Sequence, residues 1–178
     1  MSALPLLRHF ARNNKWSNLR LLRACAQLSE SDYLAARTSF FPSIHKTLTH
    51  IVLVDEYYLD ALEAGERGLS IFDDEEPFDT LAEVMRAQHA ADARLVAFVD
   101  GLTDEAALGR AVTLPRSDGP HLDRVGDVLA HLFVHQLHHR GQVHAMLAGT
   151  PVAPPQLDEY FLADDRANAE QELAAAKS

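Results

Sequence analysis

The chain has 178 residues, 47% of them hydrophobic and 24% charged, which is typical of one compact domain, and we expect a single domain over residues 1–178. Its formal net charge of −10 at pH 7 argues against binding to nucleic acid or to a membrane surface, because both need clustered Lys and Arg. No stretch approaches the roughly 20 apolar residues of a membrane span, the N-terminus is too polar for a signal peptide, and Cys25 is the only cysteine, so we expect a cytoplasmic protein.

Hydrophobic periodicity predicts four long helices. The first covers roughly residues 4–28, and Pro5 suits its first turn. Residues 29–41 lack this pattern. The second helix covers roughly residues 42–64 and ends near Gly65.

The third predicted helix covers residues 80–99 and follows a polar loop over residues 65–79. Thr80 and Glu83 have the spacing of a capping box, in which each side chain accepts a hydrogen bond from a backbone N–H of the first turn. Gly101 follows the last apolar position and is expected to end the helix.

Residues 107–123 break the helical pattern, because residues 111–114 alternate and Ser-Asp-Gly-Pro follows, which predicts a short hairpin or an extended crossover. The last long helix spans roughly residues 124–148 and ends at Gly149. The tail is read as a short helix or, over about residues 165–178, as a frayed end. The predicted fold class is all-α, a four-helix bundle with this hairpin or crossover before its last helix.

The histidines are the most informative residues, because there are ten of them and five fall between residues 131 and 144. At about 100° per residue, the last helix has an apolar stripe formed by Val125, Val128, Leu129, Leu132, Val143, Met146 and Leu147. His139 lies about 20° from the stripe centre and His135 about 60°, whereas His131, His138 and His144 lie about 100° away or more. Two imidazoles four residues apart on one helix face can bind one ion.

A third inward histidine is expected from the second helix, on a stripe that steps by three and four residues and comprises Ser43, Thr47, His50, Val54, Tyr57 and Ala61. A histidine on an apolar face costs free energy unless it is hydrogen-bonded or bound, so His50 is either a core histidine held by a carbonyl or hydroxyl, or a ligand. Together, the three inward histidines predict a divalent-metal site at His50, His135 and His139. Three imidazoles leave a coordination position open and suit Zn²⁺, Ni²⁺ or Fe²⁺.

Other polar residues carry weaker signals. Asp55, Glu56 and Asp60 fall to the sides of the His50 stripe, and the carboxylates in general are read as solvated faces. Arg140 either pairs with a carboxylate on a neighbouring helix or has a surface or structural role, and Tyr57 either packs in the core or lines a pocket. No glycine-rich phosphate loop, GxSxG elbow or glycosidase-type carboxylate pair is present.

Residues 131–147, HLFVHQLHHRGQVHAML, resemble the last-helix signature of the DinB family of damage-inducible helical proteins. Residues 48–62, LTHIVLVDEYYLDAL, are similar to the second helix of that family, and residues 10–22, FARNNKWSNLRLL, to the first. The tail segment PPQLDEYFL also resembles the family's C-terminal segment. The resemblance implies an up-down-down-up bundle that holds a divalent ion with one histidine of the second helix and two of the last, which by position are His50, His135 and His139.

The wider superfamily includes metal-dependent enzymes that use low-molecular-weight thiols, such as bacillithiol transferases and mycothiol-dependent maleylpyruvate isomerase, and its members often form dimers. The resemblance therefore implies a homodimer whose partners are a low-molecular-weight thiol and an electrophilic small molecule. Four interpretations stay open: a metal-dependent thiol S-transferase, a metal-dependent hydrolase, a non-enzymatic metal-binding stress-response protein, and a bundle without metal. The lack of a carboxylate base placed as in H-E-x-x-H counts against the hydrolase.

Overall fold

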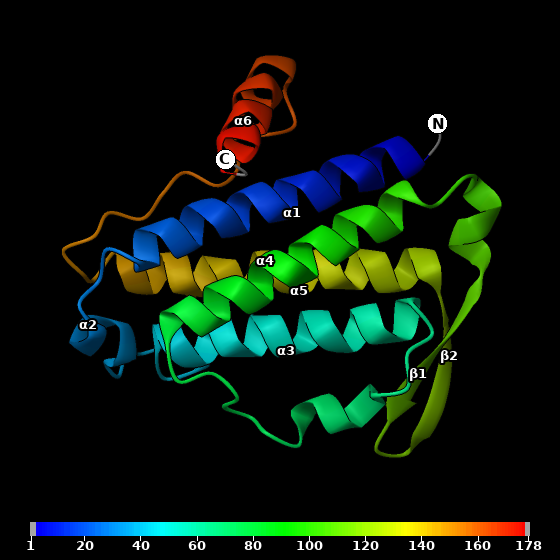
Figure 1. The fold of residues 1–178 in the computed structure, drawn as a ribbon, viewed down its shortest axis with the longest axis horizontal. Coiled ribbons are helices and arrows are strands. Elements are labelled where there is room, and N and C mark those ends of the chain that lie inside the picture. Colours follow the sequence, from blue (N-terminus) through cyan, green and yellow to red (C-terminus); the bar gives the residue numbers. More distant parts are fainter. Residues whose placement is uncertain (1–2, 177–178) are drawn as a thin grey trace.

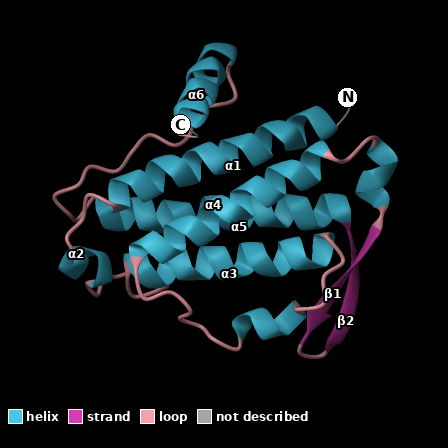
Figure 2. Cartoon of the chain, viewed as in Figure 1, coloured by secondary structure: helices cyan, strands magenta, loops and turns pink. Residues whose placement is uncertain are grey.

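The computed structural model describes residues 3–176, and the chain is mostly helical (Figures 1 and 2). Its long helices are α1 (Leu4–Cys25), α3 (Ile44–Leu62), α4 (Leu81–Asp100) and α5 (Val125–Leu147). Helix α1 packs against α4 and α5, and α3 packs against the same two helices. Helices α1 and α5 run in one direction and α3 and α4 in the other (Figure 1). The four predicted long helices are therefore present, although α1 ends at Cys25 and not near residue 28.

Side-chain caps set the starts of two of these helices. At the start of α4, the Thr80 hydroxyl accepts a hydrogen bond from the Glu83 N–H, and the Glu83 carboxylate accepts one from the Thr80 N–H, so the predicted capping box is confirmed. At the start of α3, the Ser43 hydroxyl accepts from the Lys46 N–H. Both caps satisfy N–H groups that have no partner within the helix.

The segment before α5 forms a hairpin, which confirms the first of the two predicted alternatives. Strands β1 (Ala111–Arg116) and β2 (Gly119–Arg124) pair antiparallel, with Val112 opposite Asp123. Gly119 has a φ of +124°, which a glycine adopts readily. Val112 is buried in the apolar core formed with the long helices, so one face of the two-stranded sheet is covered.

Three short helical segments were not predicted: α2 (Glu30–Leu34), η1 (Gly68–Phe72) and η2 (Glu105–Gly109). Each has five residues, which is too short for a periodic apolar stripe, and local contacts set it, such as the Ser29 cap of α2. The tail was expected to be either a short helix or a frayed end, and it forms helix α6 (Ala163–Ala175). Residues 177–178, the last two of the tail, lie outside the described residues. No helix within residues 3–176 is long and apolar enough to cross a membrane.

The apolar core between the long helices has two parts. One includes Leu95 and Leu129 and lies towards the hairpin, and the other includes Leu22, Ile44 and Leu147 and lies towards the opposite end. Buried polar side chains lie between these parts on the long helices: Asn14, Asn18, Asp55, Gln88, Asp92, Gln136 and Arg140. The predicted metal ligands lie at the same level of the long helices, because they neighbour these residues along α3 and α5.

Candidate metal centre

The structure brings together the three histidines that the sequence selected. His50 comes from α3, and His135 and His139 come from successive turns of α5, which packs against α3. Each of the three rings offers one possible ligand nitrogen, and these three nitrogens all lie within 4.8 Å of one another. The Nε2 atoms of His50 and His135 are 3.0 Å apart, and the ring centroids of His135 and His139 are 4.4 Å apart. This cluster could hold a metal ion.

The spacing of these atoms fits a shared ion. Zinc–nitrogen bonds of about 2.0–2.1 Å in a tetrahedral shell place two ligand nitrogens roughly 3.3 Å apart. The observed separations, 3.0 Å for one pair and up to 4.8 Å in the cluster, bracket that value, so small rotations about the side-chain bonds are sufficient. His139 Nδ1 donates to Oε1 of Gln142 at 2.8 Å, which leaves the lone pair on His139 Nε2. Gln142 therefore sets the tautomer that a metal ligand needs.

The electrostatics favour neutral imidazoles. Burial, with the neighbouring histidines, lowers the pKa of His50 to about 4 and that of His135 to about 3, and burial also lowers the pKa of His139. At neutral pH all three rings are therefore uncharged and can offer a lone pair. Nδ1 of His135 is sealed from solvent and has no hydrogen-bond partner among the described residues. The ring therefore carries a desolvation cost, which a metal–nitrogen bond at Nε2 would offset.

The cluster lies in an open cleft of about 360 Å³. Besides the three histidines, the cleft is lined by Phe40, Val54, Tyr58, His131 and His138. Phe40 is 77% exposed at the cleft, and the ring of Phe41 lies 4.4 Å from that of His50. The side chains of His131 and His138 are exposed, as their positions on the helical wheel predicted.

Sequence reasoning did not identify the aromatic residues of the cleft. Phe40 and Phe41 precede α3 in an irregular segment, and no periodic pattern tells which way such side chains point. Tyr58 lines the cleft, whereas its neighbour Tyr57 is buried in the core and donates a hydrogen bond to the Pro115 carbonyl. Core packing was therefore the correct interpretation of Tyr57.

A buried polar network lies beside the histidines and includes Arg140, which is 3% exposed. Nη1 of Arg140 donates to the side-chain oxygens of Asn14, Asn18 and Gln136. The Nδ2 groups of Asn14 and Asn18 in turn donate to Asp92, at 3.1 and 2.8 Å. The guanidinium is therefore separated from that carboxylate by amide groups that are bonded to both.

The expectation that the carboxylates form solvated faces is wrong for Asp55 and Asp92, which are each 1% exposed, and for Asp60, which is buried and accepts a hydrogen bond from the Gly68 N–H. Nε2 of Gln88 donates to both Asp55 and Asp92, and Nε2 of Gln136 donates to Asp55. Burial raises the pKa of Asp55 to about 7 and that of Asp92 to about 6, although the amide donors and Arg140 oppose the shift. A helical wheel for one helix could not show this, because the partners come from the other helices.

The single cysteine does not contribute to the site. Cys25 is fully buried in the apolar core, and burial raises the pKa of its thiol to about 12. A thiol in this state is protonated at neutral pH and is a poor nucleophile.

Comparison with known proteins agrees with the fold and with the sequence motif. The model of the DinB family matches residues 1–172. Among solved structures, the chain is similar to a DinB-like protein from Bacillus cereus, with 14% sequence identity, a TM-score of 0.63 and coverage of 83% of this chain and 94% of the other. At this identity the likeness shows the fold alone. A comparison with curated proteins gave no significant match.

Proposed function

The chain belongs to the DinB family, and from this premise we propose that His50, His135 and His139 bind one divalent metal ion and that the protein is a metal-dependent thiol S-transferase. The observation that carries the proposal is the convergence of three neutral imidazoles, within 4.8 Å of one another, in an open cleft. The proposal takes residues 1–178 as a single domain whose long helices form an up-down-down-up four-helix bundle.

The chemistry follows from the ligand set. Three imidazoles leave at least one position of a Zn²⁺, Ni²⁺ or Fe²⁺ ion open to a small molecule. When bound, such an ion lowers the pKa of a thiol or water that coordinates it and so supplies a nucleophile at neutral pH. This is the contribution that a thiol transferase needs, because the thiolate is the reactive form of a thiol.

The residues of the chain position the reactants. Gln142 fixes the ring of His139, and the ring of Phe41 packs against that of His50. Phe40 and Tyr58 offer aromatic surface to the body of an electrophile. His131 is exposed at the edge of the cleft, where it can accept the proton that leaves the thiol.

The lining of the cleft favours this reaction over metal-dependent hydrolysis. None of the described residues that line it is an Asp or Glu, so the cleft has no carboxylate base to activate water in the manner of H-E-x-x-H enzymes. A non-enzymatic metal-binding role in a stress response is the other alternative. The homodimer, the cytoplasmic location and the two small-molecule partners stay predictions.

Metal content tests the first part of the proposal. We expect protein purified without a histidine tag to hold close to one equivalent of metal, measured by elemental analysis, and His50→Ala to hold almost none. His144→Ala is the matched control, because His144 lies on α5 outside the cluster and donates to the Pro155 carbonyl. Equal metal content in the wild type and in His50→Ala would exclude the site.

A thiol assay tests the second part. The metal-loaded protein is incubated with a panel of low-molecular-weight thiols and 1-chloro-2,4-dinitrobenzene, and formation of the thioether is followed by absorbance. In this reaction a carbon–sulfur bond forms, chloride leaves and the thiol proton passes to a base. We expect catalysis with at least one thiol and its loss in His50→Ala. Normal metal loading with no thiol-dependent rate, and no change in the spectrum of a Co²⁺-substituted site on addition of thiol, would remove the transferase and retain the metal centre.

A further inference from the structure

A second cavity, of about 450 Å³, lies on the other side of α5 from the histidine cluster. It is open to solvent on one side and is bounded by α1, α5 and the segment 156–161 that leads to α6. Leu137 and Gly141 face it, and each lies about 200° round the helix from His139. The cavity is thus separate from the cleft of the proposed metal centre, and its volume suits a small organic molecule.

Most of the lining of this cavity is apolar. Phe10 of α1, Leu137 of α5, and Leu157 and Phe161 of the segment 156–161 supply the apolar surface. Leu137 is 52% exposed and Phe161 is 38% exposed, although both are large apolar side chains. Apolar groups that face an open cavity gain free energy when an apolar ligand covers them.

Arg140 supplies the guanidinium of the cavity, and Asn13, Ser17, His144 and Gln156 add further polar groups to its lining. All the hydrogen bonds that Arg140 donates within residues 3–176 come from Nη1. Its Nε and Nη2 have no hydrogen-bond partner within these residues. Neither atom is sealed from solvent, so both keep some accessible surface, although Arg140 as a whole is only 3% exposed and lines the cavity. Nε and Nη2 together form the edge of the guanidinium that binds a carboxylate through two parallel hydrogen bonds.

Gly141 leaves room beside this arginine. An added Cβ at Gly141 would meet no atom within 4 Å, so the glycine is not required by packing against a neighbour. A glycine inside a helix is unfavourable relative to alanine, and here it keeps the cavity open next to the guanidinium.

We propose that this cavity binds a small organic carboxylate with an apolar body, held at its carboxylate by Nε and Nη2 of Arg140 and along its body by Phe10, Leu157 and Phe161. The ligand's carboxylate supplies the acceptors that these two N–H groups lack, and the apolar body covers the exposed aromatic and aliphatic surface. The site is independent of the metal centre.

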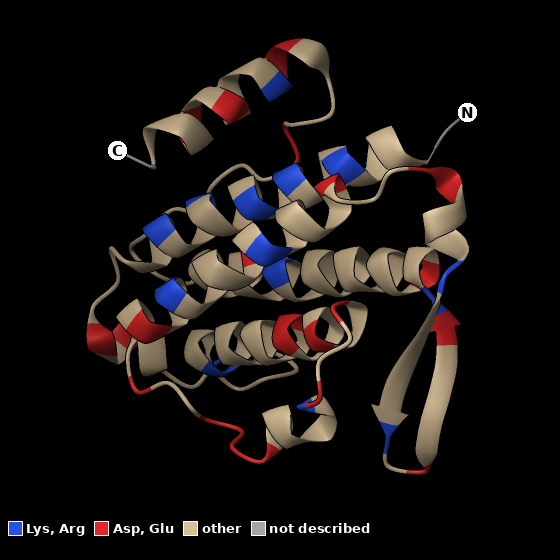
Figure 3. Ribbon diagram, turned by 45° about the vertical axis from the view of Figure 1, so that its right-hand side comes forward, with Lys and Arg blue, Asp and Glu red and all other residues tan. Residues whose placement is uncertain are grey.

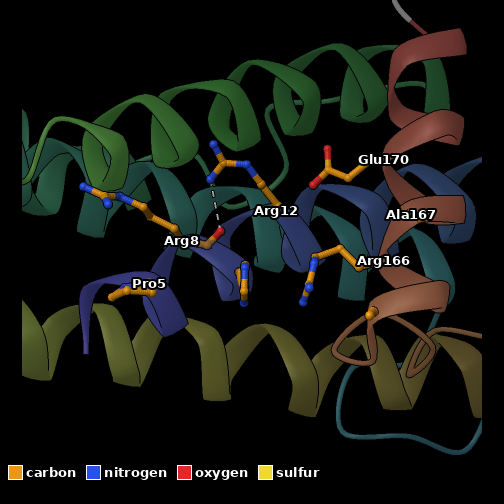
Figure 4. A pocket seen from close by; sticks show the side chains of 8 residues that line it. Pro5, Arg8, Arg12, Arg166, Ala167 and Glu170 are labelled. Atoms are coloured by element: carbon orange, nitrogen blue, oxygen red, sulfur yellow. Dashed lines mark hydrogen bonds between the residues drawn. The ribbon is translucent and has the colours of Figure 1, made fainter. Parts of the chain in front are cut away.

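Another cleft, between α1 and α6, is also lined by arginines, and it shows that arginines alone do not make a carboxylate-binding site (Figure 4). Arg12 makes a two-bond contact with Asp100, Arg8 lies 3.9 Å from the same carboxylate, and Glu170 adds a negative charge inside the cleft. These arginines belong to the run of basic side chains along α1 (Figure 3). Arg12 already bonds a carboxylate directly, Arg8 lies beside the same carboxylate, and neither arginine is buried, whereas Arg140 donates only to amide oxygens; this cleft therefore serves as the control.

One acidic residue tunes the proposed site. Asp158 lines the cavity and accepts a hydrogen bond from Gln156, so its negative charge opposes an incoming carboxylate. Asp158→Asn removes the charge and can keep that hydrogen bond. The proposal therefore predicts tighter carboxylate binding in this variant, whereas a site that recognises only apolar surface would be indifferent to it.

Calorimetric titration of the full chain with 4-phenylbutyrate and with 4-phenyl-1-butanol tests the proposal, because the two probes share an apolar body and differ in the head group. We expect the carboxylate to bind roughly ten-fold more tightly than the alcohol, or better, since hydrogen bonds to charged groups are the stronger ones. Equal affinity for the two probes, or no binding of 4-phenylbutyrate, would overturn the proposal.

Gly141→Leu is the decisive variant, because it fills the cavity without removing any existing contact, and leucine is the better helix former. We expect it to melt no lower than the wild type and to lose at least ten-fold in affinity for 4-phenylbutyrate. Arg166→Gln, in the control cleft, should keep the wild-type affinity. Binding that survives in Gly141→Leu but disappears in His50→Ala would place the carboxylate at the metal centre and refute the second site.

Discussion

The buried network around Arg140 allows a quantitative prediction from the replacement Arg140→Met, which keeps an unbranched side chain but removes the charge. Asn14, Asn18 and Gln136 would each lose the hydrogen bond that Nη1 donates to their side-chain oxygen, and Asp55 and Asp92 would lose the positive charge near them. Removal of one partner from a buried charged network costs about 3–5 kcal/mol. For a chain of this size each kcal/mol corresponds to about 2–4 °C, so the melting temperature should fall by about 6–20 °C.

Urea unfolding followed by far-UV circular dichroism measures the loss, with Arg12→Met as the matched control. Arg12 makes its two bonds to Asp100 at the surface, where such pairs contribute about 1 kcal/mol or less. A loss below about 1 kcal/mol in Arg140→Met would show that the guanidinium does not balance the buried groups as described. A double variant that adds Asp92→Asn should recover part of the loss, because it removes one uncompensated carboxylate.

Three further predictions concern the metal, pH and a helix cap. A metal supplied at 100 times its Kd should raise the stability of the wild type by about 2.7 kcal/mol, and thermal melts should show no such gain in His50→Ala. Because burial raises the pKa of Asp55 to about 7 and that of Asp92 to about 6, these two carboxyls bind more protons in the folded than in the unfolded state between about pH 4 and pH 7. Their contribution to stability therefore falls as pH rises through this range, whereas the lowered pKa values of His50 and His135 contribute the opposite slope. Between pH 5 and 7.5, urea titrations should show that the stability of the wild type falls by roughly 2–3 kcal/mol relative to that of Asp55→Asn, and parallel pH dependences would contradict a buried Asp55 that is protonated at pH 5. Thr80→Ala should cost about 0.5–2 kcal/mol because it removes the cap of α4, and an unchanged urea midpoint would mean that solvent replaces the cap fully.

Much of the local structure could be predicted from the sequence because each signal depends on few residues. The capping box needs only Thr80 and Glu83, and the hairpin needs a short alternation and a turn at Gly119. The ends of helices were predicted less well. The apolar Leu28 suggested that the first helix continues to that residue, but α1 ends at Cys25. Short segments such as α2 depend on one cap and a few contacts, which no periodic pattern reports.

The histidine cluster could also be found from the sequence, because residues on one helical stripe face the same neighbour. His135 and His139 lie four residues apart, and His50 lies in the middle of the stripe of α3, so packing of the two stripes brings the rings together. The same reasoning failed for Asp55, which a wheel places to the side of its helix. Where several long helices pack together, the sides of a helix are also interfaces, and only the partners there decide whether a carboxylate is solvated.

The sequence by itself thus determined the long helices, the hairpin and the histidines that could share a metal ion, since each follows from spacing along one or two helices. Only the tertiary structure decided that Asp92 and Arg140 are buried, because their burial depends on amide groups from other helices. It also decided that the path of residues 156–161 across α1 and α5 leaves a cavity beside Arg140. A cavity is the space that several segments leave unfilled, and no single segment encodes that space.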